Sequence, residues 1–208
     1  PVHLRRLSPP QDSLLDALRA SDFHPRDGDV IILSSKVVSI DEGRCVLKSR
    51  TTRQQLALQE SHAGFDGSSH DSPFDLAIIH HALIPSAGVD ASNSGDYYTL
   101  LPSDPCASAR KWHRILCEQY DLKSIGVIIT DSHLLPMRWG VVDIAIGFWG
   151  VNPLRDYRGE SDLFGYIFQV SQANLVDSIA SAAGWIMGQG TEQIPVVIAR
   201  HWPFAQFI

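Results

Sequence analysis

Polar residues with oxygen atoms suited to ligand binding follow an apolar run near the middle of the chain. Asp90, Ser92 and Asn93 lie in the segment PSAGVDASNSGD at residues 85–96, directly after FDLAIIHHALI. A plain turn needs only a glycine and one short polar residue. The density of carboxylate, hydroxyl and amide oxygens exceeds that need and indicates a ligand site.

A second apolar run, GVIIT, leads in the same way into Asp131 and Ser132, and a turn with Pro136 follows. In open α/β folds, ligands bind beyond the carboxyl ends of strands. Two aspartates at two such ends can share one divalent cation, and Mg²⁺ or Mn²⁺ prefers carboxylate, amide and hydroxyl oxygens. The alternative is that each aspartate only caps a helix or a turn.

Two further segments carry groups suited to phosphate. In SSKVVS, Ser35 can donate a hydrogen bond and Lys36 can supply a point charge, although a surface lysine is the plainer interpretation. In MGQGTEQ, Gly188 suits a helix C-cap, which leaves Gln189 and Gly190 to be explained. The chain has neither the GxxxxGK[ST] nor the GxGxxG phosphate-binding motif.

The segment NPLRDYRGESDLFG at residues 152–165 is dense in turn-forming and charged residues, namely Arg155, Asp156, Arg158, Glu160 and Asp162. One interpretation is a solvated loop with internal ion pairs, each contributing little to stability. The other is a contact to an anionic substrate or nucleotide. The sequence leaves both open.

Composition excludes several classes of function. The 208 residues carry a net charge of −6 and no basic run, which disfavours nucleic acid as a partner. No apolar stretch approaches the roughly 18 residues of a membrane helix, and no signal-peptide pattern opens the chain. Three cysteines without a CxxC pair indicate a reducing, cytoplasmic setting. The absence of HExxH and GxSxG argues against a zinc site and a serine hydrolase.

Periodicity and capping signals predict interleaved helices and strands, and therefore an α/β or α+β class. Asp104 suits the N-cap and Pro105 the first position of one helix. We predict one domain over residues 1–208. A loop is predicted at 64–74, and the best candidate for an internal break between two subdomains lies within it, near 64–73. The predicted helices lie within 12–20, 51–63, 103–121 and 175–188, and the predicted strands within 27–36, 75–84, 124–131, 141–151, 166–175 and 194–200.

Five motifs occur in one order: AGVDASN, GVIITDS, RWGVVDIAIG, PLRDYRGESDLFG and MGQGTEQIPVVIAR. In this order the chain resembles the γ-glutamyl ligases related to coenzyme F-420-0:L-glutamate ligase, from about Asp27 to its end. The resemblance implies an unusual α+β fold and an intertwined homodimer. It also implies that L-glutamate is joined to an acceptor carboxylate with GTP or ATP and a divalent cation, Mg²⁺ or Mn²⁺.

The resemblance also implies roles for individual residues. The implied metal ligands are Asp90, Asp131, Ser132, which replaces the family's usual threonine, and Gln189. The implied nucleotide contacts are Ser35, Lys36, Asn93, Met187, Gly188, Gln189 and Gly190. Lys36 is also a candidate catalytic residue that neutralises phosphate charge. From chemistry and position alone, Arg138 is a second candidate catalytic residue that binds a carboxylate in a bidentate fork.

Departures from the family pattern bear on the acceptor. Ile40 stands where F-420 ligases usually carry a second lysine, and residues 133–135 stand where they usually have a Gly-Arg pair. The pattern is more similar to a branch described as folate-metabolism γ-glutamate ligases. We therefore expect L-glutamate to be added to the γ-carboxylate of tetrahydrofolate through an acyl phosphate. The alternatives are an F-420-0 acceptor, a non-catalytic nucleotide or folate binder, and a metal-dependent phosphohydrolase.

Overall fold

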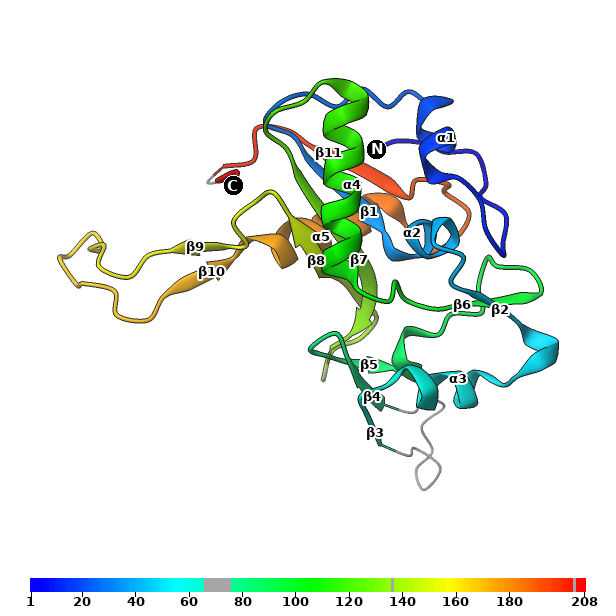
Figure 1. Ribbon diagram of the computed structural model, residues 1–208. Coiled ribbons are helices and arrows are strands. Elements are labelled where there is room, and N and C mark those ends of the chain that lie inside the picture. The colour runs from blue at the N-terminus through cyan, green and yellow to red at the C-terminus, as the bar shows by residue number, and fades with distance from the viewer. Residues whose placement is uncertain (66–75, 136, 204) are drawn as a thin grey trace.

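A four-stranded sheet lies at the centre of the computed structural model, which describes residues 1–65, 76–135, 137–203 and 205–208 (Figure 1). Its strand order is β11-β1-β7-β8. The middle strands, β1 (Val30–Ser34) and β7 (Gly126–Leu134), run parallel. The outer strands, β8 (Val141–Trp149) and β11 (Val196–Ala199), run antiparallel to their neighbours. The mixed α+β class is confirmed.

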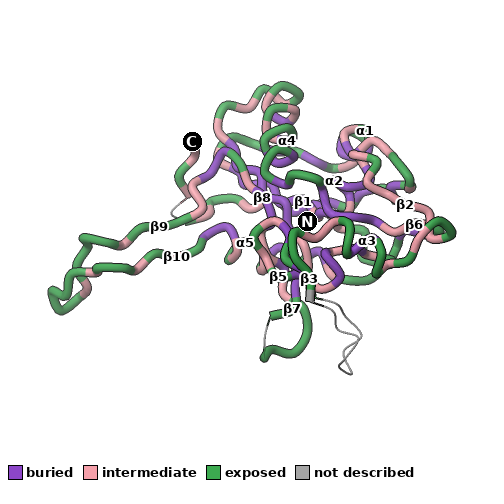
Figure 2. Tube along the Cα trace, turned by 60° about the horizontal axis from the view of Figure 1, so that its bottom comes forward, coloured by how far each residue is buried: buried purple, intermediate pink, exposed green. Residues whose placement is uncertain are grey.

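Helices cover both faces of this sheet, with α4 (Pro105–Tyr120) on one side and α5 (Leu175–Met187) on the other (Figure 1). Alternate residues of β1 enter two separate apolar clusters. Ile31 and Leu33 join the cluster of α4, and Val30 and Ile32 join the cluster of α5. Strands buried on both faces read as continuous apolar runs, which is why VIIL predicts this strand. Figure 2 shows the buried core at this sheet.

Local capping signals explain the predicted helices, all four of which form. In α4, Asp104 accepts a hydrogen bond from the Ala107 N–H at 2.9 Å, and Pro105 opens the helix. The caps of the others are Ser13 for α1 (Leu14–Arg19), a Thr52–Gln55 capping box for α3 (Arg53–Glu60) and Asn174 for α5. A further helix, α2 (Ser35–Asp41), directly follows β1.

Three small sheets surround the central one. The strands β2 (Cys45–Leu47) and β6 (Tyr97–Thr99) pair with each other. A second small sheet joins β3 (Ala63–Phe65), β4 (Leu76–Ile79) and β5 (Ala82–Pro85). The third is formed by β9 (Leu154–Asp156) and β10 (Gln172–Asn174). Short 3₁₀ helices, η1 (Lys48–Arg50) and η2 (Ser86–Gly88), follow β2 and β5.

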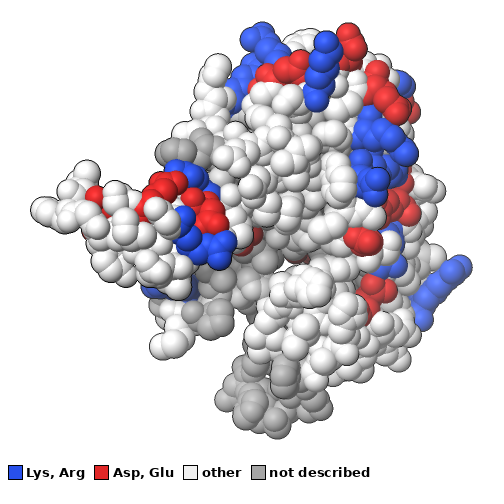
Figure 3. Space-filling model, turned by 60° about the vertical axis from the view of Figure 1, so that its left-hand side comes forward, with Lys and Arg blue, Asp and Glu red and all other residues white. Residues whose placement is uncertain are grey.

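The segment from β9 to β10 forms an arm that projects from the body (Figure 1). Its charged side chains gather near its base, and its outer end is mostly uncharged (Figure 3). The predicted strand over 166–175 is confirmed only in part, because Gln172–Asn174 forms β10 beside β9 and Leu175 begins α5. The rest of the stretch lies on the exposed outer part of the arm, where Ile167 forms only an isolated bridge to Ser161.

Two further predictions about the strands are corrected. The described part of the predicted strand 75–84, residues 76–84, is a hairpin rather than one strand, since His80 and His81 turn the chain with φ of 49° and 62°. Asp131 and Ser132 do not end their strand, because β7 continues to Leu134 beside β8. Of the predicted loop at 64–74, Gly64 and Phe65 belong to β3. Residues 66–74 of that loop lie outside the described residues, as do Pro136 and most of the predicted break.

Among the described residues, no helix is long and apolar enough to cross a membrane. Cys45, Cys106 and Cys117 are free thiols.

Candidate active-site pocket

A cavity of about 550 Å³ opens where β1 ends. Ser34, the last residue of β1, pairs with Thr130, while β7 runs on for four more residues. Asp131 on β7 therefore lies beyond the end of β1, where ligands bind in open sheets. The other walls come from the N-terminal segment 4–7, helix α2 and the loops 90–95 and 187–195.

Lys36 and Asp90 form an ion pair on one wall of this pocket. Lys36 Nζ lies 2.5 Å from Asp90 Oδ2 and donates to the Ser92 carbonyl at 2.8 Å and hydroxyl at 2.9 Å. Asp90 accepts from the Ser92 N–H at 2.7 Å. Burial alone would raise the pKa of Asp90, but Lys36 and Ser92 together hold that pKa below its usual value. Asp90 is therefore ionised at neutral pH.

Asp131 stands in a different electrostatic environment. The Ser35 hydroxyl donates to its carboxylate at 2.5 Å, and the side chain is half-buried. Burial, with the negative charges of Asp143 and Asp90, raises the pKa of Asp131 to about 7, although Ser35 and Lys36 oppose the shift. The pocket lining has four acidic residues against the three basic residues Arg5, Arg6 and Lys36, and a bound cation would relieve the repulsion among the carboxylates.

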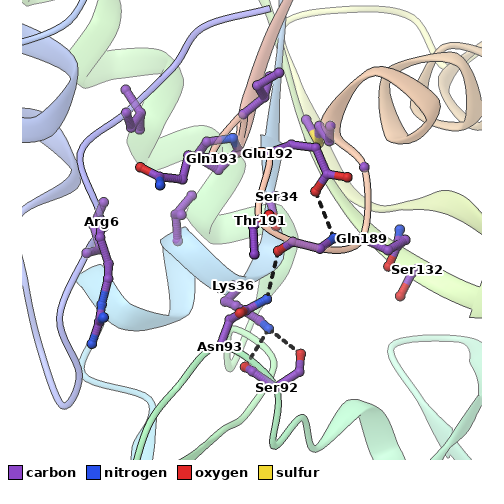
Figure 4. Close-up of a pocket in the computed structure, with 18 of the residues that line it drawn as sticks. Arg6, Ser34, Lys36, Ser92, Asn93, Ser132, Gln189, Thr191, Glu192 and Gln193 are labelled. Carbon is purple, nitrogen blue, oxygen red and sulfur yellow. Dashed lines mark hydrogen bonds between the residues drawn. The ribbon is translucent and has the colours of Figure 1, made fainter.

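The loop after α5 closes the opposite wall. Gly188 ends the helix with a φ of 72°, and a Cβ atom there would lie 2.3 Å from the Glu192 Cδ. Glu192 accepts from the Gly190 N–H at 2.8 Å, and Asn93 donates to the Gly190 carbonyl at 3.1 Å. In Figure 4, Asn93 reaches toward the loop after α5, and Lys36 reaches toward Ser92. These bonds join two segments that the sequence singled out separately.

Most of the predicted site residues line this one pocket: Lys36, Asp90, Asn93, Asp131, Ser132, Met187, Gly188, Gln189 and Gly190. Ser35 lies behind the lining, bonded to Asp131. Arg138 is not brought to the pocket, because it lies exposed at the tip of the hairpin between β7 and β8.

Sequence reasoning missed four charged residues of the pocket, namely Arg5, Arg6, Asp143 and Glu192. Asp143 had a usable signal, since it is an acid that interrupts the apolar strand VVDIAIG. For Arg6 the signal in the sequence was weaker, namely that it follows directly on Arg5. Figure 4 places Arg6 on the far side of the pocket from Ser132.

The charged segment 152–165 does not contribute to the pocket lining. Arg158 pairs with Asp156 at 2.6 Å and Arg155 pairs with Glu160 at 2.7 Å, all within the arm. The segment therefore has the internal ion pairs of the first interpretation, and it makes no part of this pocket.

The donor atoms of the pocket fit one kind of metal site. In the part of the chain that the structure describes, no three or more His, Cys, Asp or Glu residues lie close enough to hold a metal ion. A closed structural centre of the zinc type is thus not formed there. The oxygens of Asp90, Asp131, Ser132 and Gln189 suit Mg²⁺ or Mn²⁺, which takes one or two carboxylates and fills its other positions with phosphate and water.

A family model described as F420-0:Gamma-glutamyl ligase matches residues 11–201, and the chain belongs to this family. The coenzyme F420:L-glutamate ligase of Methanopyrus kandleri is 35% identical over 96% of this chain and 85% of its own. Enzymes of the same name from Methanothermobacter thermautotrophicus and Archaeoglobus fulgidus are 32% and 35% identical. Those alignments cover 92% and 89% of this chain and 82% and 80% of theirs. The protein is an amide-forming ligase, as the five motifs predict.

Proposed function

We propose that this enzyme adds L-glutamate to a carboxylate of coenzyme F420-0, using GTP or ATP and a divalent cation, Mg²⁺ or Mn²⁺. The observation that carries the proposal is the convergence of Lys36, Asp90, Asp131 and the loop at Gln189 on one pocket. The names of its relatives support the acceptor. Three free cysteines support a reducing compartment, the cytoplasm.

Amide formation from a free carboxylate requires activation. In the proposed route, an acceptor carboxylate oxygen attacks the γ-phosphorus of the nucleotide, and the nucleoside diphosphate leaves. The amine of glutamate then attacks the carbonyl carbon of the acyl phosphate, phosphate departs, and the nitrogen loses its proton. A bound divalent cation would neutralise phosphate charge. The protein's part is to position the reactants and to supply charge.

Lys36 is the residue that we assign to the transferred phosphate. Its ammonium group is held by Asp90 and Ser92 at the pocket wall, so its position is fixed before a ligand binds. Asp90 and Asp131, with Ser132 and the Gln189 oxygen, would hold the cation. Asn93 and the loop Met187–Gly190 would contact the nucleotide, with Ser35 holding Asp131 in place.

Tetrahydrofolate is the second candidate acceptor, because of Ile40. Its side chain is 3% exposed on α2 and lines the pocket with an apolar surface where F-420 ligases usually carry a lysine. The names of the relatives favour coenzyme F420 over folate.

We further propose that the enzyme works as a homodimer. On the arm, Leu163, Phe164 and Val170 are 98%, 95% and 83% exposed. Apolar side chains gathered on one exposed segment mark an interaction site. We choose a second copy of the chain as the partner because it is present in any solution of the enzyme.

Mass spectrometry of one reaction tests the function. The mixture contains enzyme, L-glutamate, Mg²⁺ with Mn²⁺, GTP with ATP, and F420-0 beside tetrahydrofolate. We expect F420-0 to gain one glutamyl unit, with release of nucleoside diphosphate. The matched control is Asp90→Asn, which should yield no product.

Other products would contradict the proposal in distinct ways. A glutamylated folate alone would transfer the assignment to the second acceptor. Nucleotide hydrolysis without any acceptor would indicate a phosphohydrolase. Bound nucleotide without product from either acceptor would indicate a non-catalytic binder.

A further inference from the structure

Asp143 is a buried carboxylate that neither the motifs nor the relatives' names assign to a role. It lies on β8 opposite Ser132, lines the pocket and is only 8% exposed. Burying a carboxylate is costly unless it is hydrogen-bonded. Its side chain accepts one hydrogen bond, from Gln189 Nε2 to Asp143 Oδ1 at 3.2 Å. The contact joins β8 to the loop that follows α5.

Helix α5 leaves room for this carboxylate. A Cβ atom on Gly184 would lie 2.2 Å from the Asp143 Cγ, so only glycine lets the helix pass so close. A glycine inside a helix costs roughly 0.5–1 kcal/mol relative to alanine. The helix carries this residue where Asp143 approaches it, one turn before the loop that holds Gln189. The packing thus fixes the carboxylate at a set distance from that loop.

The hydrogen bond determines which way the Gln189 amide faces. Asp143 Oδ1 is the acceptor in this contact, so it pairs with the NH₂ end of the amide. The amide oxygen of Gln189 then points away from Asp143. An amide binds a divalent cation through its oxygen and not through its nitrogen. An amide that is free to flip would present the wrong end part of the time.

We propose that Asp143 is a positioning residue that fixes the Gln189 amide so that its oxygen is presented to the divalent cation. The proposal rests on the cation site of the proposed function. Direct ligation by Asp143 is the competing arrangement. It is disfavoured because Asp90, Asp131 and Asp143 do not form a group close enough to hold one metal among the described residues.

Mn²⁺ titration of the full chain, with free Mn²⁺ followed by electron paramagnetic resonance, tests the proposal. The variants are Asp143→Leu, Asp143→Asn, Gln189→Ala and the double variant Asp143→Leu/Gln189→Ala. Loss of a residue that orients a metal ligand typically weakens metal binding by about 10–100-fold, and we expect that loss in Asp143→Leu. Asp143→Asn keeps an acceptor oxygen and should stay within about threefold of the unaltered chain. The double variant should bind no more weakly than Gln189→Ala alone.

A matched control separates positioning from general damage. Asp177 also bridges β8 and α5, since it accepts from the Ala145 N–H at 2.8 Å, but it does not line the pocket. Asp177→Leu should lower the melting temperature and leave the affinity for Mn²⁺ unchanged.

Three results would overturn the proposal. The first is an Asp143→Asn variant that binds Mn²⁺ as weakly as Asp143→Leu, which would make Asp143 a ligand. The second is a further loss in the double variant. The third is an unaltered chain that binds no Mn²⁺. Because no step here measures product, a chain that binds Mn²⁺ as expected but makes no glutamylated acceptor would refute the proposed function alone.

Discussion

The pocket and the arm are both rich in charged and polar residues, but their bonds join parts of the chain at very different separations. In the pocket, Lys36 bonds to Ser92, 56 residues away, and Asn93 bonds to Gly190, 97 residues away. On the arm, Arg158 pairs with Asp156, two residues away. The pocket's polar contacts therefore exist only in the folded chain, whereas those of the arm need little beyond a local turn.

This difference in sequence separation distinguishes a pocket that the fold assembles from an exposed segment with local ion pairs. A long-range polar contact has to be positioned by the packing of several elements, which here are β1, α2, β7 and α5. A local pair on an exposed ribbon is screened by water and contributes little. The arm segment is the more densely charged of the two in sequence, so charge density does not mark the pocket and the separation of the bonded partners is the better indicator of function.

The largest effect is expected in the pocket. Asp90→Asn and Asp131→Asn should each lower kcat by at least about 10²–10³-fold, because each removes a charge that holds the cation near the reacting phosphate. Circular dichroism should show the fold intact. Steady-state release of nucleoside diphosphate in the presence of glutamate and acceptor measures the effect. Near-normal turnover in either variant would show that the carboxylate is not part of the site.

Asp131→Asn should also change the stability of the metal-free protein, and in the opposite direction. Burial beside Asp143 and Asp90 raises the pKa of Asp131 to about 7, above its value in the unfolded chain. Ionised Asp131 therefore opposes folding, and the penalty grows from about pH 4 to pH 7.

The variant should gain on the order of 1 kcal/mol in the free energy of unfolding above pH 7 and nothing near pH 4. Denaturant titrations at both pH values in a chelating buffer measure this. Equal stability of the two proteins at pH 8 would mean that Asp131 is not strained by its neighbours.

The arm should matter for assembly rather than for folding. Leu163→Asp combined with Phe164→Asp places two charges on its most exposed apolar residues. If these side chains bind a second copy, the variant should elute as a monomer, because burying two unpaired carboxylates is unfavourable. Light scattering after gel filtration gives the mass. A variant that remains dimeric would place the subunit contact elsewhere, and Leu163→Ala with Phe164→Ala serves as the uncharged control.

The sequence predicts those parts of the fold that local signals determine. The apolar run VIIL predicts β1 because both of its faces are buried, and Asp104 with Pro105 predicts the start of α4. The turn at His80–His81 is missed because it lacks the glycine or asparagine that usually adopts positive φ. Of the strand predicted over 166–175, only Gln172–Asn174 forms, because alternation alone does not extend the pairing with β9 along the exposed arm.

The candidate site is predicted where its residues follow strands and helices, and missed where a contact depends on packing. Asp90 and Gln189 are found because turn chemistry and the family motifs mark them. Asp143 is missed because its role comes from a contact to a residue 46 positions away. Arg138 is assigned to the site from its closeness to Asp131 in sequence, but the β7–β8 hairpin carries it to an exposed tip.

The smallest effect is expected for the ion pair on the arm. Arg158→Ala removes a partner that lies 2.6 Å from Asp156. The guanidinium lowers the pKa of Asp156 to about 2 through its hydrogen bonds, so the carboxylate stays ionised at neutral pH with or without it. Because both groups are exposed and screened by water, the melting temperature should change by less than about 1 °C. Scanning calorimetry at low and high salt measures this, with Lys36→Ala as the contrasting variant in the pocket. A larger shift for Arg158→Ala than for Lys36→Ala would show that the arm, and not the pocket, is the region whose polar contacts hold the fold.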